Sequence, residues 1–233
     1  MKKSVLLILF LSMFSFAQAQ SSATTDYWFE GFIYKNNNEG HPFLTVVLTE
    51  IGNDKPKAVS MSSDIGYVDF KGVPIDIYKD HILSVYMGNI LLGQYVRDGF
   101  KKKPKFTGNL NVHMNILNCS NEFKKVSYTP TDDENSMYIG EFLIKKGFDI
   151  EDISIFPINS QAPFKLFLNG HHVDYNKISV LLKQISMKMV QNINIYEYIN
   201  PNPYYSGAIS IQLTEGPIAT FPVELPLRSL REK

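Results

Sequence analysis

The side chains best suited to chemistry in this chain are its five histidines. Three stand alone, at His41, His81 and His113, and two are adjacent, at His171 and His172. None follows a metal-ligand spacing, and adjacent side chains on an extended segment point apart. We expect His41 and His81, each beside a turn, to be solvated, and His113 to lie on the polar face of a strand. The histidine pattern therefore predicts no metal site.

Nucleophilic chemistry has equally little support. Cys119 is the only cysteine, so no internal disulfide can form, and we interpret it as a half-buried thiol at a strand end or in a linker. A redox or intermolecular role is the alternative. The chain contains no Gly-x-Ser-x-Gly, no His-Glu-x-x-His and no phosphate-binding P-loop sequence. We therefore expect no enzymatic activity and no cofactor.

Two charged runs have structural interpretations. Lys101-Lys102-Lys103-Pro104-Lys105 predicts a solvated loop or a guarded edge strand, because Lys and Pro discourage strand pairing. Contact with a phosphate or a lipid headgroup is the alternative. Asp132-Asp133-Glu134 lacks the spacing of a calcium-binding EF-hand loop, and Thr131 with Glu134 matches a helix capping box instead. Across the chain, 23 Lys and Arg balance 23 Asp and Glu, so we expect no nucleic-acid partner.

A loop rich in Asn, Pro and Tyr, residues 200–206, is the candidate contact surface for a partner. Tyr is enriched at protein interfaces because it buries a large area with few rotatable bonds. The alternative is that Tyr204 and Tyr205 pack on the neighbouring sheet. Together with the adjacent histidines, the candidate partner-binding residues are His171, His172, Asn202, Tyr204 and Tyr205.

The N-terminus predicts an export signal over residues 1–19. Lys2 and Lys3 precede an apolar run, residues 5–16, that is too short to span a membrane comfortably. Ala17-Gln18-Ala19 matches a signal-peptidase cleavage site. We expect a mature chain without a transmembrane segment, located in the periplasm or associated with the outer membrane.

Alternating residues predict strands through the first half of the chain. Leu110, Val112, Met114 and Ile116 alternate with polar residues, which places the apolar set on one face. Further strands are expected at residues 27–34, 43–50, 66–71 and 81–86, with Asn-, Asp- and Gly-rich turns between them. This pattern is typical of an antiparallel β-sandwich over residues 27–117.

The second half mixes strands with helices. Residues 118–135 are polar and predict a linker, and residues 136–215 form the second predicted domain. A helix is expected to follow Thr131, turn Met137, Tyr138, Phe142 and Leu143 inward, and end near Gly147. The other expected elements are strands at 153–158, 164–168, 192–197 and 208–213 and a helix beginning at Asp174 and running to Ile185. Residues 216–233 contain three prolines and predict an extended tail.

The first half resembles a carboxypeptidase regulatory-like domain. The resemblance rests on Gly31-Phe32-Ile33-Tyr34, Gly40-His41-Pro42 and the run Asp64-Ile65-Gly66-Tyr67-Val68-Asp69-Phe70. In that family an Asp-x-x-Gly-aromatic sequence precedes a strand ending in Phe, whereas here one residue separates Asp64 from Gly66. The resemblance implies a transthyretin-like sandwich.

The second half resembles the plug domain of TonB-dependent outer-membrane receptors. The matching order is a strand with an Asn-Gly turn, a helix, a strand, a Pro/Tyr/Gly loop and a returning strand, at residues 166–170, 176–185, 192–197, 200–207 and 208–213. The resemblance implies a plug-like module without the β-barrel. The predicted fold is therefore mainly β with α+β: an N-terminal antiparallel β-sandwich followed by a small α+β plug-like domain.

Together these resemblances imply a non-catalytic exported binding or assembly protein associated with the outer membrane, similar to the N-terminal part of a TonB-dependent receptor. Its expected partner is an outer-membrane or periplasmic protein. The alternative is a surface adhesin or carbohydrate-binding module, because exposed aromatic side chains stack on sugars. Trp28 is the single tryptophan, and its place in an apolar strand predicts core packing.

Overall fold

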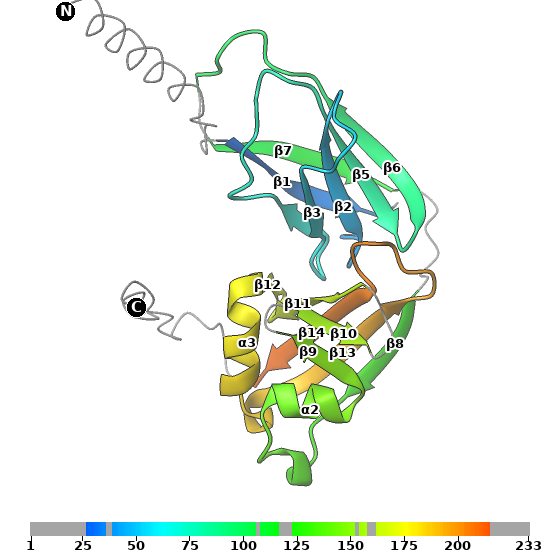
Figure 1. The fold of residues 1–233 in the computed structure, drawn as a ribbon, viewed down its shortest axis with the longest axis vertical. Coiled ribbons are helices and arrows are strands. Elements are labelled where there is room, and N and C mark those ends of the chain that lie inside the picture. Colours follow the sequence, from blue (N-terminus) through cyan, green and yellow to red (C-terminus); the bar gives the residue numbers. More distant parts are fainter. Residues whose placement is uncertain are drawn as a thin grey trace, which may run out of the picture. The chain divides into compact units, whose positions relative to one another are not determined.

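The chain divides into two compact units, Met1–Asn121 and Glu122–Lys233, in a computed structural model (Figure 1). The structure describes residues 27–35, 39–105, 108–116, 123–151, 154–157 and 162–214. This described part is mainly β, with few helices. The predicted export signal at residues 1–19, Cys119 and the predicted tail at 216–233 lie outside the described residues.

The first unit is a β-sandwich. Its described strands are β1 (Tyr27–Tyr34), β2 (Thr45–Glu50), β3 (Ala58–Met61), β4 (Tyr67–Asp69), β5 (His81–Met87), β6 (Ile90–Arg97) and β7 (Gly108–Asn115). They form one sheet in the order β4-β1-β7 and another in the order β3-β2-β5-β6. The predicted strand at residues 27–34 is confirmed as β1.

The core of the sandwich is formed by side chains that alternate between buried and half-buried along its strands. Along β1 every second residue is buried, including Phe29 and Ile33. The partner strands supply Leu83 and Val85 from β5 and Val112 from β7. Each fully buried side chain of this size stabilises the fold by about 1.5–3 kcal/mol.

The prediction of a wholly antiparallel sandwich is wrong for one pair of strands. β1 and β7 run parallel, with Tyr27 opposite Gly108 and Tyr34 opposite Asn115. Parallel neighbours require a crossover connection, and between β1 and β7 the chain passes through the strands of the β3-β2-β5-β6 sheet. Alternation reports which face of a strand is buried, and it carries no information about strand direction.

The prediction that His41 and His81 are solvated is also wrong. Both are buried, with exposed fractions of 0% and 2%. The amide of His41 donates to the Ile33 carbonyl at 2.7 Å, which holds this turn against β1. The ring of His81 packs edge-on against Phe29, with 5.4 Å between ring centroids. Burial lowers the pKa of both imidazoles.

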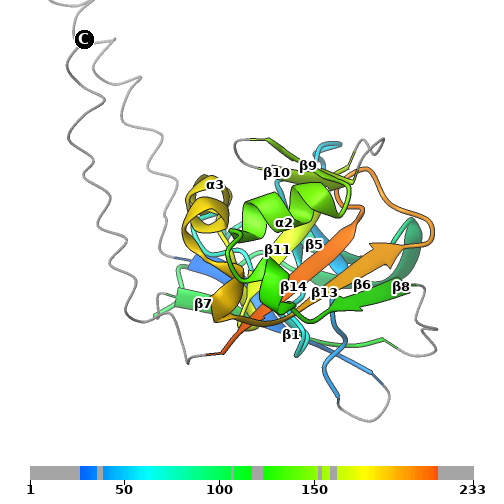
Figure 2. The same cartoon turned by 90° about the horizontal axis from the view of Figure 1, so that it is seen from below.

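The second unit is a mixed sheet covered by helices. Its described strands are β8 (Phe123–Tyr128), β9 (Phe148–Glu151), β10 (Ser154–Pro157), β11 (Phe164–Leu168), β12 (His171–His172), β13 (Val190–Tyr198) and β14 (Gly207–Leu213). The sheet order is β8-β13-β14-β11-β10-β9, and β12 pairs with β11. The helices are α2 (Ile139–Lys145) and α3 (Tyr175–Gln184), which lie on the same face of the sheet (Figure 1 and Figure 2).

The predicted linker is in part structured. Residues 123–128 form β8, an edge strand that pairs antiparallel with β13, and Ser127 Oγ donates to Asn194 Oδ1 at 2.7 Å. Asp132–Glu134 forms a short 3-10 helix, η1, and the amide of Thr131 donates to Glu134 Oε2 at 3.2 Å, as the capping box predicts. The sequence did not predict β8, because this strand pairs with β13, which is distant in the sequence.

A single apolar core joins the helices to the sheet. Phe142 and Leu143 of α2 and Ile178 and Leu182 of α3 pack against strand residues such as Ile209, and all are buried. The helical stripe predicted for residues 178–185 is confirmed. Among the described residues, every helix is too short or too polar to cross a bilayer.

Candidate protein-binding site

The predicted loop is held in one conformation by Asn202. Its side-chain Oδ1 accepts the amides of both Tyr204 and Tyr205, each at 2.9 Å. At the end of the loop, Ser206 Oγ donates to the Ala162 carbonyl at 2.7 Å. Asn202 is itself 5% exposed, and its side-chain amide hydrogen-bonds to the backbone of the same loop.

The five predicted partner-binding residues have different surroundings. Tyr205 is 2% exposed, and its ring lies 5.5 Å from Lys165 Nζ, so it packs as the alternative interpretation predicts. Tyr204 is half-buried, whereas His171 and His172 are exposed in β12. Asn202 and Tyr205 therefore support the loop, and Tyr204 with the two histidines remain accessible for contact.

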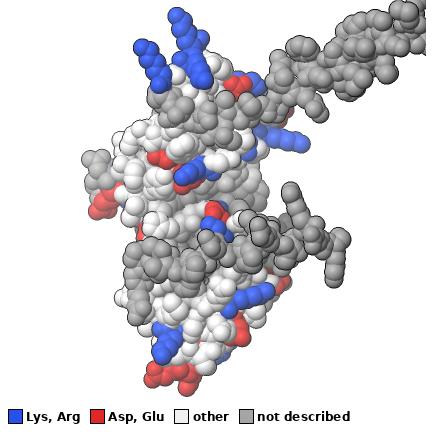
Figure 3. All heavy atoms as spheres, turned by 90° about the vertical axis from the view of Figure 1, so that its left-hand side faces the viewer, with Lys and Arg blue, Asp and Glu red and all other residues white. Residues whose placement is uncertain are grey.

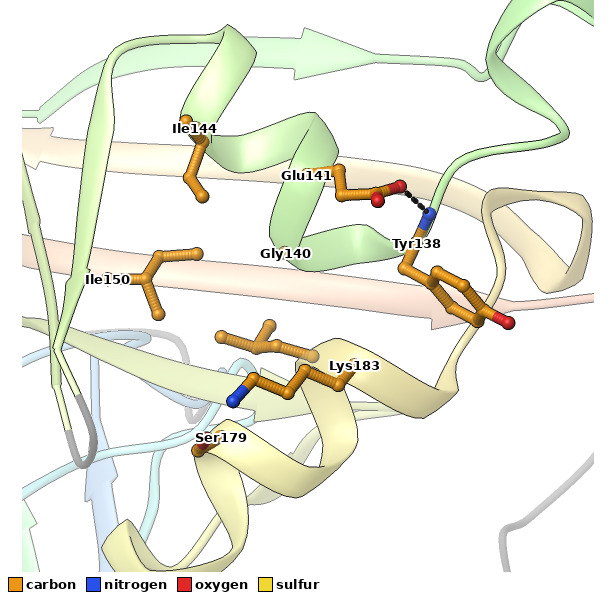
Figure 4. Close-up of a pocket in the computed structure, with 8 residues that line it drawn as sticks. Tyr138, Gly140, Glu141, Ile144, Ile150, Ser179 and Lys183 are labelled. Carbon is orange, nitrogen blue, oxygen red and sulfur yellow. Dashed lines mark hydrogen bonds between the residues drawn. The ribbon is translucent and has the colours of Figure 1, made fainter.

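A groove between α2 and α3 offers a better-formed surface. It encloses about 330 Å³, close to the lower limit of typical ligand pockets. Its lining is mostly apolar and includes Tyr138, Ile144, Ile150 and Leu182, with Glu141 and Lys183 as charged members. Figure 4 shows Tyr138 at one end of the groove and Ile144 with Ile150 at the other.

The groove exists because α2 starts close to α3. Gly140 has no side chain at the point of approach, and a Cβ there would stand 3.2 Å from the Leu182 carbonyl oxygen. The start of α2 is capped by Glu141, whose Oε2 accepts the Tyr138 amide at 2.9 Å (Figure 4). Tyr138 also forms a β-bridge with Ser186, which follows α3.

Large apolar side chains are exposed at both ends of the groove. The exposed fractions are 45% for Tyr138 and 60% for Ile144. Lys183 is exposed in the last turn of α3, where a positive charge is favoured by the helix dipole. This arrangement can hold an apolar segment of another molecule and pair an acidic group with Lys183.

The prediction that Tyr138 points inward is wrong. The helix begins at Ile139, so Ile139, Phe142 and Leu143 form the buried stripe and Tyr138 stands at the N-cap. Ile144 lies beside that stripe, on the exposed side. An isoleucine outside the helical stripe was the available signal for this surface.

In the described ranges, no group of three or more His, Cys, Asp and Glu side chains could hold a metal ion.

Comparison with families and curated proteins finds no relative. No family model matches the chain, and no curated protein matches it.

Among solved structures, part of the chain is similar to the structure of Klebsiella pneumoniae 5-hydroxyisourate hydrolase. The identity is 14%, and the match covers 40% of this chain and 87% of the other, with a TM-score of 0.27. The similarity is to a transthyretin-like β-sandwich over part of the chain, and it assigns no family. A similarity of this size decides nothing about function.

Proposed function

We propose that this chain is a non-catalytic binding or assembly protein, exported and associated with the outer membrane of a bacterium. The export signal predicted at residues 1–19 supports the location. The order β11, β12, α3, β13, loop and β14 agrees with the plug-like arrangement expected from the sequence. In this proposal the second unit is a plug-like module that binds a partner, and the partner is an outer-membrane or periplasmic protein.

The observation that carries the proposal is the α2–α3 groove. Exposed apolar side chains at Tyr138 and Ile144 flank a preformed hollow, which suits an aliphatic protein segment. Lys183 selects for an acidic residue beside that segment. Glu141 is engaged in capping α2, so its position is explained by the helix rather than by proton transfer.

The test is site-specific photo-crosslinking from the groove in native envelopes. A photoreactive residue at position 144 should join the chain to one protein of defined mass. Ile144→Asp should weaken capture of that protein by at least tenfold. Ile65→Asp changes an isoleucine of similar exposure, 63%, in the first unit and should leave capture unchanged. Equal loss in both variants would contradict the groove as the binding surface.

The predicted loop needs its own variant. Tyr204→Ala should weaken partner capture if the accessible part of the loop joins the interface. The side chain of Tyr204 is half-buried, whereas the ring of Tyr205 is buried and packs near Lys165. Unchanged capture would restrict the interface to the groove.

A second candidate function, carbohydrate binding, is favoured by one observation. The outer face of the β4-β1-β7 sheet carries a row of half-buried aromatic side chains: Trp28, Phe32, Tyr34 and Tyr67. Ring centroids lie 5.8 Å apart for Phe32 and Tyr34 and 5.3 Å apart for Phe32 and Tyr67. Trp28 therefore lies on this face rather than in the core, contrary to the prediction.

Polar groups interrupt the aromatic row. Glu30 accepts the Trp28 indole N–H at 2.7 Å and the Tyr67 hydroxyl at 3.3 Å, and it also accepts the Asn109 amide. Although burial opposes ionisation, these hydrogen bonds lower the pKa of Glu30. Aromatic faces beside a carboxylate and amides match the apolar faces and hydroxyls of a sugar ring.

Glycan-array binding separates the two candidates. Carbohydrate binding predicts a signal that Tyr34→Ala abolishes and that Tyr78→Ala, a change at an exposed tyrosine outside this sheet, leaves intact. No glycan signal would eliminate this second candidate and leave the protein-binding proposal unaffected.

A further inference from the structure

Three loops emerge at one end of the sandwich. The strand register aligns Glu50 at the end of β2 with His81 at the start of β5, and His81 with Arg97 at the end of β6. The segments that follow β2, precede β5 and follow β6 therefore leave the sheet together (Figure 1). We call residues 51–57, 70–80 and 98–105 the loop end.

Backbone and side-chain hydrogen bonds tie these loops into one platform. The carbonyl of Asp80 accepts the Ile51 amide at 2.9 Å, and its Oδ1 accepts the Gly99 amide at 2.7 Å. The Phe100 amide donates to the Ile77 carbonyl at 2.8 Å. Asp80 thus connects all three loops, so side chains on them keep fixed relative positions.

Positive charge is concentrated on one of the loops. Lys101, Lys102, Lys103 and Lys105 are exposed, and no acidic residue interrupts them. In Figure 3, several basic side chains project from the surface at the top of the view. The neighbouring lysines Lys57 and Lys79 are paired with Glu50. The three loops together carry eight lysines and four exposed aspartates, Asp54, Asp76, Asp80 and Asp98, so lysines outnumber aspartates there by four.

The same platform exposes apolar surface. Tyr78 is 56% exposed and Ile51 is 47% exposed, and each belongs to a loop held by Asp80 or its neighbours. Flexible ammonium groups around exposed aromatic and aliphatic side chains are typical of peripheral membrane contacts, where the cations meet headgroup phosphates and the apolar groups enter the headgroup boundary. A solvated loop explains the lysines alone but not the exposed Tyr78 and Ile51 on the two loops joined to it.

We propose that the loop end binds the surface of a bilayer containing anionic lipids. Lys101, Lys102 and Lys103 contact headgroup phosphates, and Tyr78 and Ile51 enter the interface. The lysine run favours a lipid surface over an acidic protein, because compact ammonium charges on long stems suit mobile phosphates and no bidentate arginine geometry is built here. The contact is independent of the partner surface proposed for the second unit.

Vesicle flotation of the full mature chain tests this proposal. The protein should float with vesicles of phosphatidylethanolamine and phosphatidylglycerol and stay behind with vesicles of phosphatidylethanolamine and phosphatidylcholine. Combining Lys101→Glu, Lys102→Glu and Lys103→Glu should weaken partitioning about a hundredfold or more. The matched control combines Lys125→Glu, Lys145→Glu and Lys188→Glu, exposed lysines of the second unit, and should partition like the parent chain.

A fluorescence readout reports insertion directly. Tyr78→Trp should show a blue-shifted emission on adding the anionic vesicles, and the parent chain, with Trp28 alone, should show none. The Lys101→Gln, Lys102→Gln, Lys103→Gln variant checks that loss of binding follows loss of charge, since it avoids like-charge repulsion within the loop. Equal binding to both vesicle types, or equal loss in the control triple, would overturn the proposal. Binding to an acidic protein without vesicle binding would overturn it in favour of a protein ligand.

Discussion

Gly140 of α2 and Leu182 of α3 lie so close together that a Cβ on Gly140 would stand 3.2 Å from the Leu182 carbonyl oxygen. This approach brings the start of α2 against the last turns of α3. Tyr138 and Lys183 then flank the groove that we assign to the partner. The proposed function therefore depends on a contact in which one residue has no side chain.

Gly140→Val should separate α2 from α3. A branched side chain at this contact overpacks the helix pair, and we expect the free energy of unfolding to fall by about 1–3 kcal/mol. Partner capture should fall with it. The comparison is Lys145→Val, which places the same β-branched residue on the exposed side of α2 and should cost less than about 1 kcal/mol. Equal effects of the two changes in denaturant unfolding would contradict the packing argument.

Asn202→Ala should release the loop at residues 200–206. It removes the acceptor for the Tyr204 and Tyr205 amides, and we expect a loss of about 1–3 kcal/mol because those groups lose their partner. Hydrogen exchange should accelerate at these two amides. Asn202→Asp keeps an oxygen acceptor in the same place and should retain most of the protection. Unchanged exchange in the alanine variant would show that the loop does not depend on Asn202.

The first unit should lose stability in mild acid. Burial lowers the folded-state pKa of His41 and His81, whereas the unfolded chain binds a proton near pH 6.5. The contribution of the two neutral histidines to the free energy of unfolding is therefore fully present above about pH 6.5 and is lost as the pH falls below it. The slope is at most about 1.4 kcal/mol per pH unit for each histidine.

Trp28 reports this unfolding selectively, because the only tryptophan lies in the first unit. Replacing His41 and His81 with Phe should flatten the acid dependence of the Trp28 transition. His113→Phe, at an exposed position on β7, should leave the slope as it is. A slope that persists in the double variant would place the titrating groups elsewhere.

Local patterns predicted strands of two kinds: β1, in which every second residue is buried, and a short run in which every residue is buried. The strand expected at residues 164–168 is β11. The turn expected after it is also present: Asn169 and Gly170 both have positive φ, at 48° and 78°, which suits the tight hairpin from β11 to β12. Here the residue types alone demand the conformation.

Features that depend on distant partners were not predicted. β6 carries exposed Ile90, Leu91 and Val96, so it lacks the alternation that marks a half-buried strand. β8 is organised by β13, about seventy residues later. The groove needs two helices to meet at Gly140, and no pattern within α2 reports where α3 lies. His41 and His81 were misplaced for the same reason, since a nearby turn says nothing about what packs over it.

The most direct test of the central claim is photo-crosslinking from position 144 in intact envelopes, with position 65 as the control. The proposal predicts one crosslinked outer-membrane or periplasmic protein from position 144, none from position 65, and loss of the product when Tyr138→Asp is added. The same products from both positions, or none from position 144 with the folded protein in place, would contradict a binding function at the α2–α3 groove.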